Sequence, residues 1–477
     1  MSTALVWLRR DLRLHDQPAL AAAAQQADRV VPLYIHAPEE VTPAIGAASH
    51  WWLHRSLAAL AGRLAAAGSR LCLDRGAAAE RLRHWAQVSE ADTVYCTSIA
   101  EPWARRQEAA VRAALAEAGV ALAILADGLL TDPSAVRNRS GTPYRAFTPF
   151  WRSVRPQIDP PRPVPAPALP PLPDAIPEPR PLEALGLLPR IRWDSKLEAC
   201  WRPGEPAAQE RLTRFTEDGL AAYTERRDYP ARDGTSRLSP RLHFGEVSVR
   251  AVWHAAAEAG AAQPGAEAGV DAFLGELGWR EFGHHLLWQD PGLCCRPFDR
   301  RFEAFPWRAD PGGALLDAWR RGATGIPLVD AGMRELWATG WMHNRLRMVV
   351  GSFLVKNLRL PWQHGEAHFR DTLVDWELAG NSMGWQWVSG CGADAAPYFR
   401  IFNPVRQGER FDPDGDYVRH WVPEVAGLPK SHIHQPWAAP ADVRARGGIH
   451  LGWTYPEPLV DLRASRQEAL AAFHALG

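Results

Sequence analysis

The sequence predicts an N-terminal α/β domain with a doubly wound parallel sheet, followed by a C-terminal all-α domain. Three observations lead to this prediction. Short apolar runs alternate with amphipathic helical patterns over residues 1–130, proline dominates the stretch that follows, and only helical periodicity is found from Pro206 onward. A chain of 477 residues is also too long to fold around one hydrophobic core.

Five apolar runs near the N-terminus have the length and composition of strands: Ala4–Leu8, Val30–Ile35, Arg70–Leu73, Thr93–Cys96 and Val120–Leu125. Helical patterns rich in Ala, Leu and Arg lie between them: Pro18–Ala27, His50–Ala67, Ala78–Gln87 and Pro102–Ala118. This βαβ alternation is typical of a Rossmann-like sheet. The first strand runs into WLRRDLRLHD rather than GxGxxG, so we expect no ordinary dinucleotide site there.

We expect the α/β domain over residues 1–132, a connector over 133–205 and the all-α domain over 206–477. The connector contains PPRPVPAPALPPLP, which cannot form a helix or a sheet and should run extended over the surface. The helices expected in the third part are Gln209–Ala222, Val247–Ala259, Val270–Trp288, Gly313–Arg320, Pro327–Ala338, Trp341–Leu358 and Glu366–Leu378.

Composition excludes little by itself. Basic and acidic residues both number 54, so net charge favours neither nucleic acid nor membrane, although a local basic patch can still attract phosphate. The 22 tryptophans suit core packing, base stacking or electron transfer. Six cysteines without a CxxC pair indicate a reduced, intracellular protein. No signal peptide and no run of about 20 apolar residues is found, so we expect a soluble cytoplasmic protein without membrane contact.

The stretch from Asp375 to Pro404 concentrates candidate chemistry. Asp375, Glu377 and Asn381 can hold the polar edge of a heterocycle, while Trp385 and Trp387 suit its flat face. A helix end with aromatic core packing is the alternative interpretation of the same residues.

The same stretch also carries four glycines and an aromatic run, which ends with Tyr398, Phe399 and Arg400. We expect four glycines to interrupt any long helix and bring backbone close to a ligand: Gly380, Gly384, Gly390 and Gly392.

A hydroxyl-rich loop, GTSRLSP at residues 234–240, opens a helix and can cradle a phosphate or pyrophosphate. A helix cap with ordinary turn residues is the alternative. Glu276, Trp279 and Arg280 have the spacing of one helix face, where they can bind a base or form a surface ion pair beside a core Trp.

A second helix repeats this spacing with Asn344, Arg347 and Met348, and Asp375 is a natural partner for Arg347 if that arginine is buried. The paired histidines have no third ligand nearby, so we expect no metal site.

These segments together resemble the cryptochrome/photolyase flavoproteins, and within them the bacterial class I cyclobutane pyrimidine dimer (CPD) photolyases. The resemblance spans almost the whole chain. It rests on several motifs in a fixed order: LVWLRRDLRLHDQPAL, PYRAFTPFW, GTSRLSP, ELGWREF, GWMHNRLRM, NSMGWQW and GADAAPYFRIFNP.

The resemblance implies a bound FAD. The residues that would hold its phosphates and ribityl chain are Tyr223, Thr235, Ser236, Arg237, Leu238 and Ser239. Those that would surround its rings are Glu276, Arg280, Asn344, Arg347, Asp375, Glu377 and Asn381. Asn381 falls where photolyases place an amide near flavin N5. Trp385, Trp362 and Trp307 match the family's tryptophan chain for photoreduction of the flavin.

The implied function is light-driven repair of CPDs in duplex or single-stranded DNA, by electron transfer from excited reduced FAD to a flipped-out dimer. Glu276 would contact a thymine and stabilise the reacting dimer. Trp279, Trp387 and Met348 would line the lesion pocket. Arg227, Arg345 and Arg400 match positions that grip the DNA backbone, which makes affinity dependent on salt.

Some positions depart from the family pattern. Glu377 stands where an Asp is usual. Residues typical of a methenyltetrahydrofolate antenna are absent at Ala104 and Cys295, so this antenna is not expected. A deazaflavin, another flavin or no antenna remain open, and the identity of a second chromophore is unknown.

Three alternatives remain. A (6-4) photolyase needs two histidines where this chain has Asn344 and Met348. A cryptochrome photoreceptor would signal rather than repair, and an inactive flavin- or DNA-binding relative is the third. We expect a monomer, because the lesion face must be free to meet a duplex.

Overall fold

The computed structural model describes residues 1–395 and 399–476. The chain divides into two compact units, and each is described by itself. The sheet unit comprises Met1–Ala221, Ser236–Pro291 and Val374–Leu378. The helical unit comprises Ala222–Thr235, Gly292–Leu373 and Ala379–Gly477.

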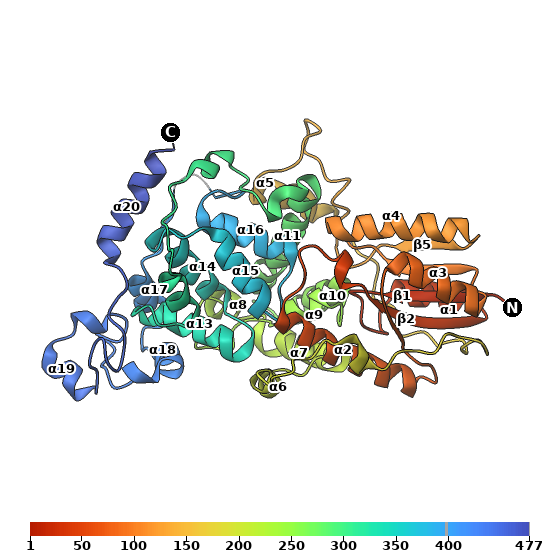
Figure 1. Ribbon diagram of the computed structural model, residues 1–477, viewed down its shortest axis with the longest axis horizontal. Coiled ribbons are helices and arrows are strands. Elements are labelled where there is room, and N and C mark those ends of the chain that lie inside the picture. The colour runs from red at the N-terminus through yellow and green to blue at the C-terminus, as the bar shows by residue number, and fades with distance from the viewer. Residues whose placement is uncertain (396–398, 477) are drawn as a thin grey trace. The chain divides into compact units, whose positions relative to one another are not determined.

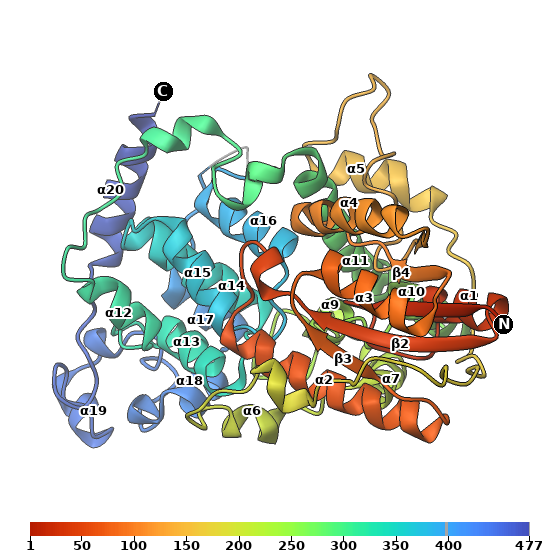
Figure 2. The same cartoon turned by 45° about the vertical axis from the view of Figure 1, so that its right-hand side comes forward.

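The sheet unit is built on a five-stranded parallel sheet with the strand order β3-β2-β1-β4-β5. Figure 2 labels its strands β2, β3 and β4. Its strands are β1 (Thr3–Leu8), β2 (Arg29–His36), β3 (Cys72–Arg75), β4 (Thr93–Thr97) and β5 (Ala121–Leu125). The predicted doubly wound sheet is confirmed. One strand is displaced: β3 starts two residues later than expected, and its residues pair with Leu33–His36 of β2. The Asp74 carboxylate in β3 accepts a hydrogen bond from the indole N–H of Trp85 at 2.8 Å.

Helices cover the sheet in the predicted places: α1 (Pro18–Gln26), α2 (Ala47–Ala66), α3 (Ala78–Ser89) and α4 (Pro102–Glu117). One core lies between the sheet and the pair α3 and α4. There Leu5 and Leu33 from the strands pack with Leu82, Trp85 and Leu115. Both faces of the central strands are buried, which is why their sequence is continuously apolar rather than alternating.

The proline-rich segment forms no helix or strand over residues 158–181, as its composition predicts. It is fastened to the sheet edge by backbone hydrogen bonds from Val30 N to Pro171 O, at 3.2 Å, and from Arg180 N to Leu73 O, at 2.9 Å. Leu172 and Ile176 pack against the α/β core. The segment is therefore part of the sheet unit.

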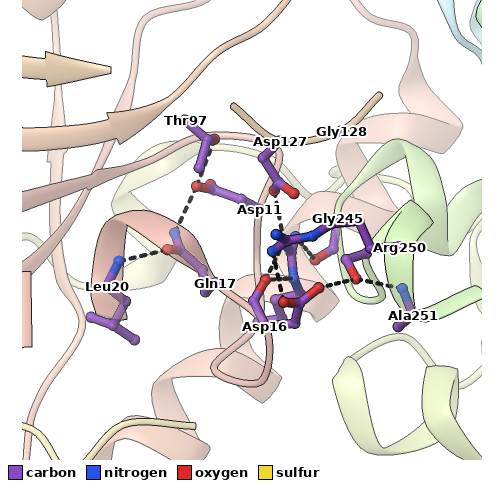
Figure 3. A network of polar contacts seen from close by, with 12 residues as sticks. Asp11, Asp16, Gln17, Leu20, Thr97, Asp127, Gly128, Gly245, Arg250 and Ala251 are labelled. Atoms are coloured by element: carbon purple, nitrogen blue, oxygen red, sulfur yellow. Dashed lines mark hydrogen bonds and ion pairs between the residues drawn. The ribbon is translucent and has the colours of Figure 1, made fainter. Parts of the chain in front are cut away.

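A polar network fills the space beyond the end of β1 (Figure 3). The Asp11 carboxylate accepts hydrogen bonds from Arg9 N at 2.7 Å and from the Thr97 hydroxyl at 2.8 Å. The Arg13 guanidinium contacts Asp127 at 2.7 Å and the Asp16 carbonyl at 2.7 Å. The motif WLRRDLRLHD thus places its own charged side chains at the strand ends, where doubly wound sheets commonly bind ligands.

The remaining helices of the sheet unit are α5 (Phe147–Val154), α6 (Ser195–Cys200), α7 (Glu205–Arg214), α9 (Ser239–His243), α10 (Val249–Ala262) and α11 (Glu267–Gln289). The predicted helix Gln209–Ala222 is wrong. It breaks into α7 and a π-helical turn at Phe215–Gly219. Just after this turn α11 packs closely on the backbone: a Cβ on Gly269 would lie 2.0 Å from the Leu220 carbonyl oxygen.

The helical unit contains α8 (Tyr223–Arg226), α12 (Ala314–Arg320), α13 (Pro327–Thr339), α14 (Asn344–Ser352), α15 (Trp362–Thr372), α16 (Leu378–Ser389), α17 (Pro404–Phe411), α18 (Asp416–Trp421), α19 (Ala441–Arg446) and α20 (Leu462–His474) (Figure 1). Its described residues form no strand beyond one isolated bridge between Leu451 and Tyr455. The predicted all-helical character is confirmed.

Three details of the helical prediction are wrong. Trp341–Leu358 is not one helix, because α14 gives way to a π-helical turn at Phe353–Asn357. Glu366–Leu378 is not one helix either, because α15 ends where Leu373 turns to an extended backbone.

Glycines do not break α16, which runs through both Gly380 and Gly384. A Cβ on Gly384 would meet nothing within 4 Å, so this glycine marks no close approach of another group.

Candidate functional site

A buried charge cluster joins α11 to the segment before α16 in the sheet unit. The Arg280 guanidinium lies 2.9 Å from the Glu377 carboxylate, and His284 Nε2 lies 3.2 Å from the same oxygen. Burial opposes ionisation of Glu377, but the charges of Arg280 and His284 outweigh it and hold the pKa of this carboxyl well below its usual range. Glu377 is therefore an ionised anchor that fixes the position of Arg280.

The hydroxyl-rich loop lies where the chain passes from the helical unit, at Thr235, to the sheet unit, at Ser236. Arg237 takes a left-handed backbone conformation, with φ of 50°. Ser239 opens the short helix α9 and donates its hydroxyl to the Asp375 carboxylate at 2.6 Å. Ser239 and Asp375, which the sequence places 136 residues apart, are thus brought together.

Glu276, Trp279 and Arg280 all lie on α11, as their spacing predicts. The Trp279 indole stacks on Phe147, with ring centroids 3.8 Å apart and planes 10° from parallel. Phe147 stands at the start of α5. Trp279 is half-buried, and one of its faces is covered by this ring, so its orientation is fixed before any ligand arrives.

In the helical unit, Asn381 and Trp385 lie on α16 and pack against α15. The Asn381 side-chain amide donates to the Glu366 carboxylate at 3.1 Å. Trp385 packs edge-on against Phe369, at 4.9 Å between centroids, and against the fully buried Trp319, at 6.1 Å. Gly365 is required beneath Trp385, because a Cβ there would lie 2.0 Å from the indole.

Candidate DNA-contacting residues form two groups in the helical unit. The Arg400 guanidinium lies 5.4 Å from the centroid of the Trp387 ring. Arg345 pairs with Asp228 at 2.7 Å, and Asp228 directly follows Arg227, whose guanidinium lies 5.1 Å from the Tyr223 ring.

Each group combines a guanidinium with an aromatic face. Tyr398, which opens the predicted aromatic run before Arg400, lies outside the described residues.

Three further predicted residues, Asn344, Arg347 and Met348, lie on α14. Asn344 is exposed at the start of α14, and Met348 is half-buried one turn later. Arg347 donates its Nε to the Met342 carbonyl at 2.8 Å. Its expected partner Asp375 belongs to the other compact unit, so that pairing stays a prediction.

The three tryptophans of the predicted electron-transfer chain are not in ring contact with one another. Trp362 is buried at the start of α15, and Trp307 packs on Phe305 at 4.5 Å. Within residues 1–395 and 399–476, no ring contact links Trp385 to Trp362 or Trp362 to Trp307.

Three neighbours of the predicted residues were not anticipated: Phe147, Glu366 and Trp319. Phe147 belongs to the aromatic and basic segment GTPYRAFTPFW. The composition of this segment drew attention to it as a whole, but nothing in it singled out Phe147. Glu366 and Trp319 stand in ordinary amphipathic helices. Their contacts depend on how α12, α15 and α16 pack together, which no local pattern encodes.

Comparison with known proteins identifies the family. A model of the DNA photolyase domain matches residues 4–170, and a model of the FAD binding domain of DNA photolyase matches residues 273–475. A deoxyribodipyrimidine photo-lyase of Agrobacterium fabrum is 44% identical over 473 residues, which cover 99% of this chain and 98% of that protein. The chain belongs to the cryptochrome/photolyase family.

The relatives of this chain include both a photolyase of known structure and a cryptochrome. A crystal structure described as a bacterial class III photolyase from Agrobacterium tumefaciens superposes with a TM-score of 0.95 at 43% identity, covering 100% of this chain and 98% of the other. Cryptochrome-1 of Arabidopsis thaliana is 38% identical and covers 98% of this chain, while the match spans 69% of its own length.

FAD is the cofactor that the matched domain binds, and the residues present fit it. The Ser382 hydroxyl and the Trp385 indole N–H, both on α16, are buried without a hydrogen-bond partner among the described residues. The loop at 235–239 combines hydroxyls with a left-handed residue, a backbone geometry that exposes N–H groups to phosphate. Hydrogen-bonding capacity is thus left over beside the predicted cofactor residues.

Neither a metal centre nor a membrane-spanning helix is found among the described residues. No group of three or more His, Cys, Asp and Glu side chains is arranged to hold a metal ion in residues 1–395 and 399–476. No helix in that part of the chain is long and apolar enough to cross a membrane.

Proposed function

We propose that the protein is a light-dependent deoxyribodipyrimidine photo-lyase that repairs CPDs in DNA. The observation that carries the proposal is the stack of Trp279 on Phe147 on the helix that also bears Glu276 and Arg280. One face of this flat indole is covered by Phe147, and the other would stack on a pyrimidine dimer extruded from the DNA. Relatives of nearly full-length similarity are named for this activity.

Each group of residues has a separate task in this proposal. Bound reduced FAD, excited by blue light, would supply one electron to the lesion and receive it back. The chain orients the reactants: Trp279 and Trp387 stack against the dimer, Met348 gives an apolar contact, and Glu276 accepts a hydrogen bond from a thymine. Arg280 is held by Glu377, and Asn381 by Glu366, so neither side chain needs to reorganise when substrate binds.

DNA would be held mainly through its phosphates. Arg227, Arg345 and Arg400 combine positive charge with an adjacent aromatic face. Arg345 is already paired with Asp228, so binding to a phosphate requires exchange of that partner. The partner of the protein is therefore UV-damaged DNA, bound by a monomer.

The subclass suggested by the motifs was class I. A relative at 43% identity is instead described as class III, and we propose that subclass for this chain in place of class I. Two residues of α14 support a CPD rather than a (6-4) product as the substrate in this proposal. Asn344 and Met348 stand where a (6-4) photolyase needs two histidines, and neither can donate or accept a proton in catalysis.

The test is a repair assay on two oligonucleotides, one with a thymine CPD and one with a (6-4) product. The FAD-loaded, reduced protein is incubated with each in blue light and in the dark. Loss of the CPD in the light alone is expected, with the (6-4) product unchanged. Absence of repair of either lesion, with FAD bound and photoreducible, would show that a cryptochrome-type photoreceptor is the better description.

A further inference from the structure

A cavity of about 1120 Å³ lies in the helical unit. Its walls come from the first turns of α17 and α20, from the turn at Pro436–Ala438 and from the end of the π-helical turn at Phe353–Asn357 (Figure 1). No residue that lines it belongs to the sets predicted for FAD, the lesion or the tryptophan chain. The cavity therefore has no role in the proposed repair reaction.

Two residues that line this cavity, Asn357 and Gln407, each carry a buried amide oxygen without a partner among the described residues. Asn357 is 2% exposed, and its Nδ2 donates to the Ser465 hydroxyl at 2.9 Å. Its Oδ1 accepts no hydrogen bond from the described residues, and neither does the buried Oε1 of Gln407. An unpaired buried acceptor costs about 1–3 kcal/mol. A ligand that carries N–H donors would satisfy these two acceptors.

Three arginines give the cavity its charge: Arg406 on α17, and Arg463 and Arg466 on α20. Within residues 1–395 and 399–476 their guanidinium groups make no hydrogen bond or ion pair. Of the two acids in the lining, Asp461 is engaged as the N-cap of α20, where it accepts from Arg463 N at 2.9 Å and Ala464 N at 2.7 Å. An excess of unpaired guanidinium groups favours an anion with several oxygens, such as a phosphate.

The cavity also offers a flat apolar surface. Trp437 is half-buried in the wall, and Phe402 and Val460 line the cavity with it. An indole face stacks on planar heterocycles and adds about 1–3 kcal/mol for each nucleic-acid base. Phosphate, flat ring and N–H donors are combined in one kind of ligand, a nucleotide whose base carries an exocyclic amino group.

We propose that this cavity is a nucleotide-binding site, separate from the predicted FAD and lesion residues. Its arginines would bind the phosphate, Trp437 would stack on the base, and the amide oxygens of Asn357 and Gln407 would accept the base amino group. The nucleotide is either a free mononucleotide or one unit of a DNA strand, since both present the same chemistry. The proposal is independent of the light reaction.

The test is isothermal titration calorimetry of the FAD-loaded protein with four ligands, each in a separate titration. They are deoxyadenosine monophosphate, thymidine monophosphate, inorganic phosphate and an undamaged single-stranded oligonucleotide. We expect saturable binding of the adenine nucleotide, at least fivefold weaker binding of the thymine nucleotide, and none of phosphate alone at the same concentrations. Asn357→Ala should reduce the preference for adenine. The double variant Arg463→Ala, Arg466→Ala should weaken binding at least tenfold, and Arg106→Ala, an exposed arginine on α4, should not.

The arginine variants change exposed side chains, so they keep the test valid if Asn357→Ala does not fold. Binding of the oligonucleotide alone, with loss in the double variant, would support the site and identify a DNA strand as the source. Equal affinity for phosphate and nucleotide would overturn the nucleotide proposal. Binding that is absent in every arm, or unchanged in the double variant, would overturn the site itself.

Discussion

At the scale of single residues, the stack of Trp279 on Phe147 prepares this indole for the role that we propose. A half-exposed indole on a helix is ordinary, but stacking on Phe147 at 3.8 Å fixes its plane. In the proposed function the rigid ring would then lose little conformational entropy when a base stacks on its other face. Phe147 would act through Trp279 rather than by touching the substrate.

Phe147→Ala should therefore weaken binding of a CPD-containing duplex. An aromatic pair contributes about 0.5–1.5 kcal/mol, so we expect a loss of affinity of roughly threefold to tenfold. Phe147→Tyr keeps the ring and should restore the affinity. The measurement is a binding titration in the dark, with an undamaged duplex as competitor. Equal affinities for wild type and Phe147→Ala would show that the stack does not position Trp279.

Glu377 is the second residue whose role follows from its contacts. Its pKa is depressed in the folded protein, so its ion pair stabilises the fold above the unfolded pKa of about 4.3 and stops doing so as pH falls through the lower folded value. Glu377→Gln should cost about 1–3 kcal/mol at pH 7. The difference from wild type should shrink as the pH falls below about 4.3.

Urea unfolding at a series of pH values measures this difference. The matched control is Glu303→Gln, because Glu303 is 53% exposed and pairs with Arg300 on the surface, where such pairs contribute little. A Glu377→Gln variant whose destabilisation is the same at pH 7 and pH 4 would contradict the assigned ion pair.

At the scale of elements, the loop after β1 depends on compensated buried charge. Arg13 is 2% exposed and neutralises Asp127, while Asp16 accepts from Arg250 at 2.6 Å and from the Ser248 hydroxyl (Figure 3). These contacts join β1 to the start of α10. Charges of both signs are buried here, and removing one leaves the other uncompensated.

Arg13→Met should destabilise the sheet unit by about 3–5 kcal/mol, because Asp127 would stay buried without its partner. Guanidinium chloride unfolding monitored by circular dichroism gives the change. Arg83→Met, at an exposed position on α3, serves as the control and should change stability by less than about 0.5 kcal/mol. A stable Arg13→Met variant would mean that the network is dispensable.

The contact between α15 and α16 depends on one glycine. A Cβ on Gly365 would lie 2.0 Å from the Trp385 indole, whereas one on Gly384 would meet nothing within 4 Å. Gly365→Ala should cost about 1–3 kcal/mol through overpacking. Gly384→Ala should stabilise the chain by about 0.5–1 kcal/mol through helix propensity. Thermal unfolding of the two variants tests both signs, and destabilisation by Gly384→Ala would contradict the open space there.

At the scale of the whole molecule, local sequence signals predicted most of the elements. Uninterrupted apolar runs located the strands of the sheet, and proline identified the extended segment over residues 158–181. The failures came where tertiary packing overrides local pattern. The predicted helices Gln209–Ala222 and Trp341–Leu358 run across the π-helical turns at Phe215–Gly219 and Phe353–Asn357, because one such turn alters the apolar pattern too little to be recognised. Gly384 resembles a helix breaker, although a Cβ there would meet nothing within 4 Å.

Site residues were predicted in part for the same reason. The sequence singled out Arg280 and Ser239 in two separate motifs and placed Asp375 and Glu377 together in a third. Only packing shows that Glu377 pairs with Arg280 and Asp375 with Ser239. Phe147 and Glu366 hold predicted residues in place from other helices, and spacing along the chain contains no record of such contacts.

The most direct test of the central claim uses cells. A bacterial strain without photolyase is given this chain, irradiated with UV, and divided between blue light and darkness. We predict that survival recovers in the light alone, and that a Trp279→Ala variant which retains FAD recovers far less. Equal survival in light and darkness, with FAD-loaded protein present in the cells, would contradict the claim that this chain repairs pyrimidine dimers.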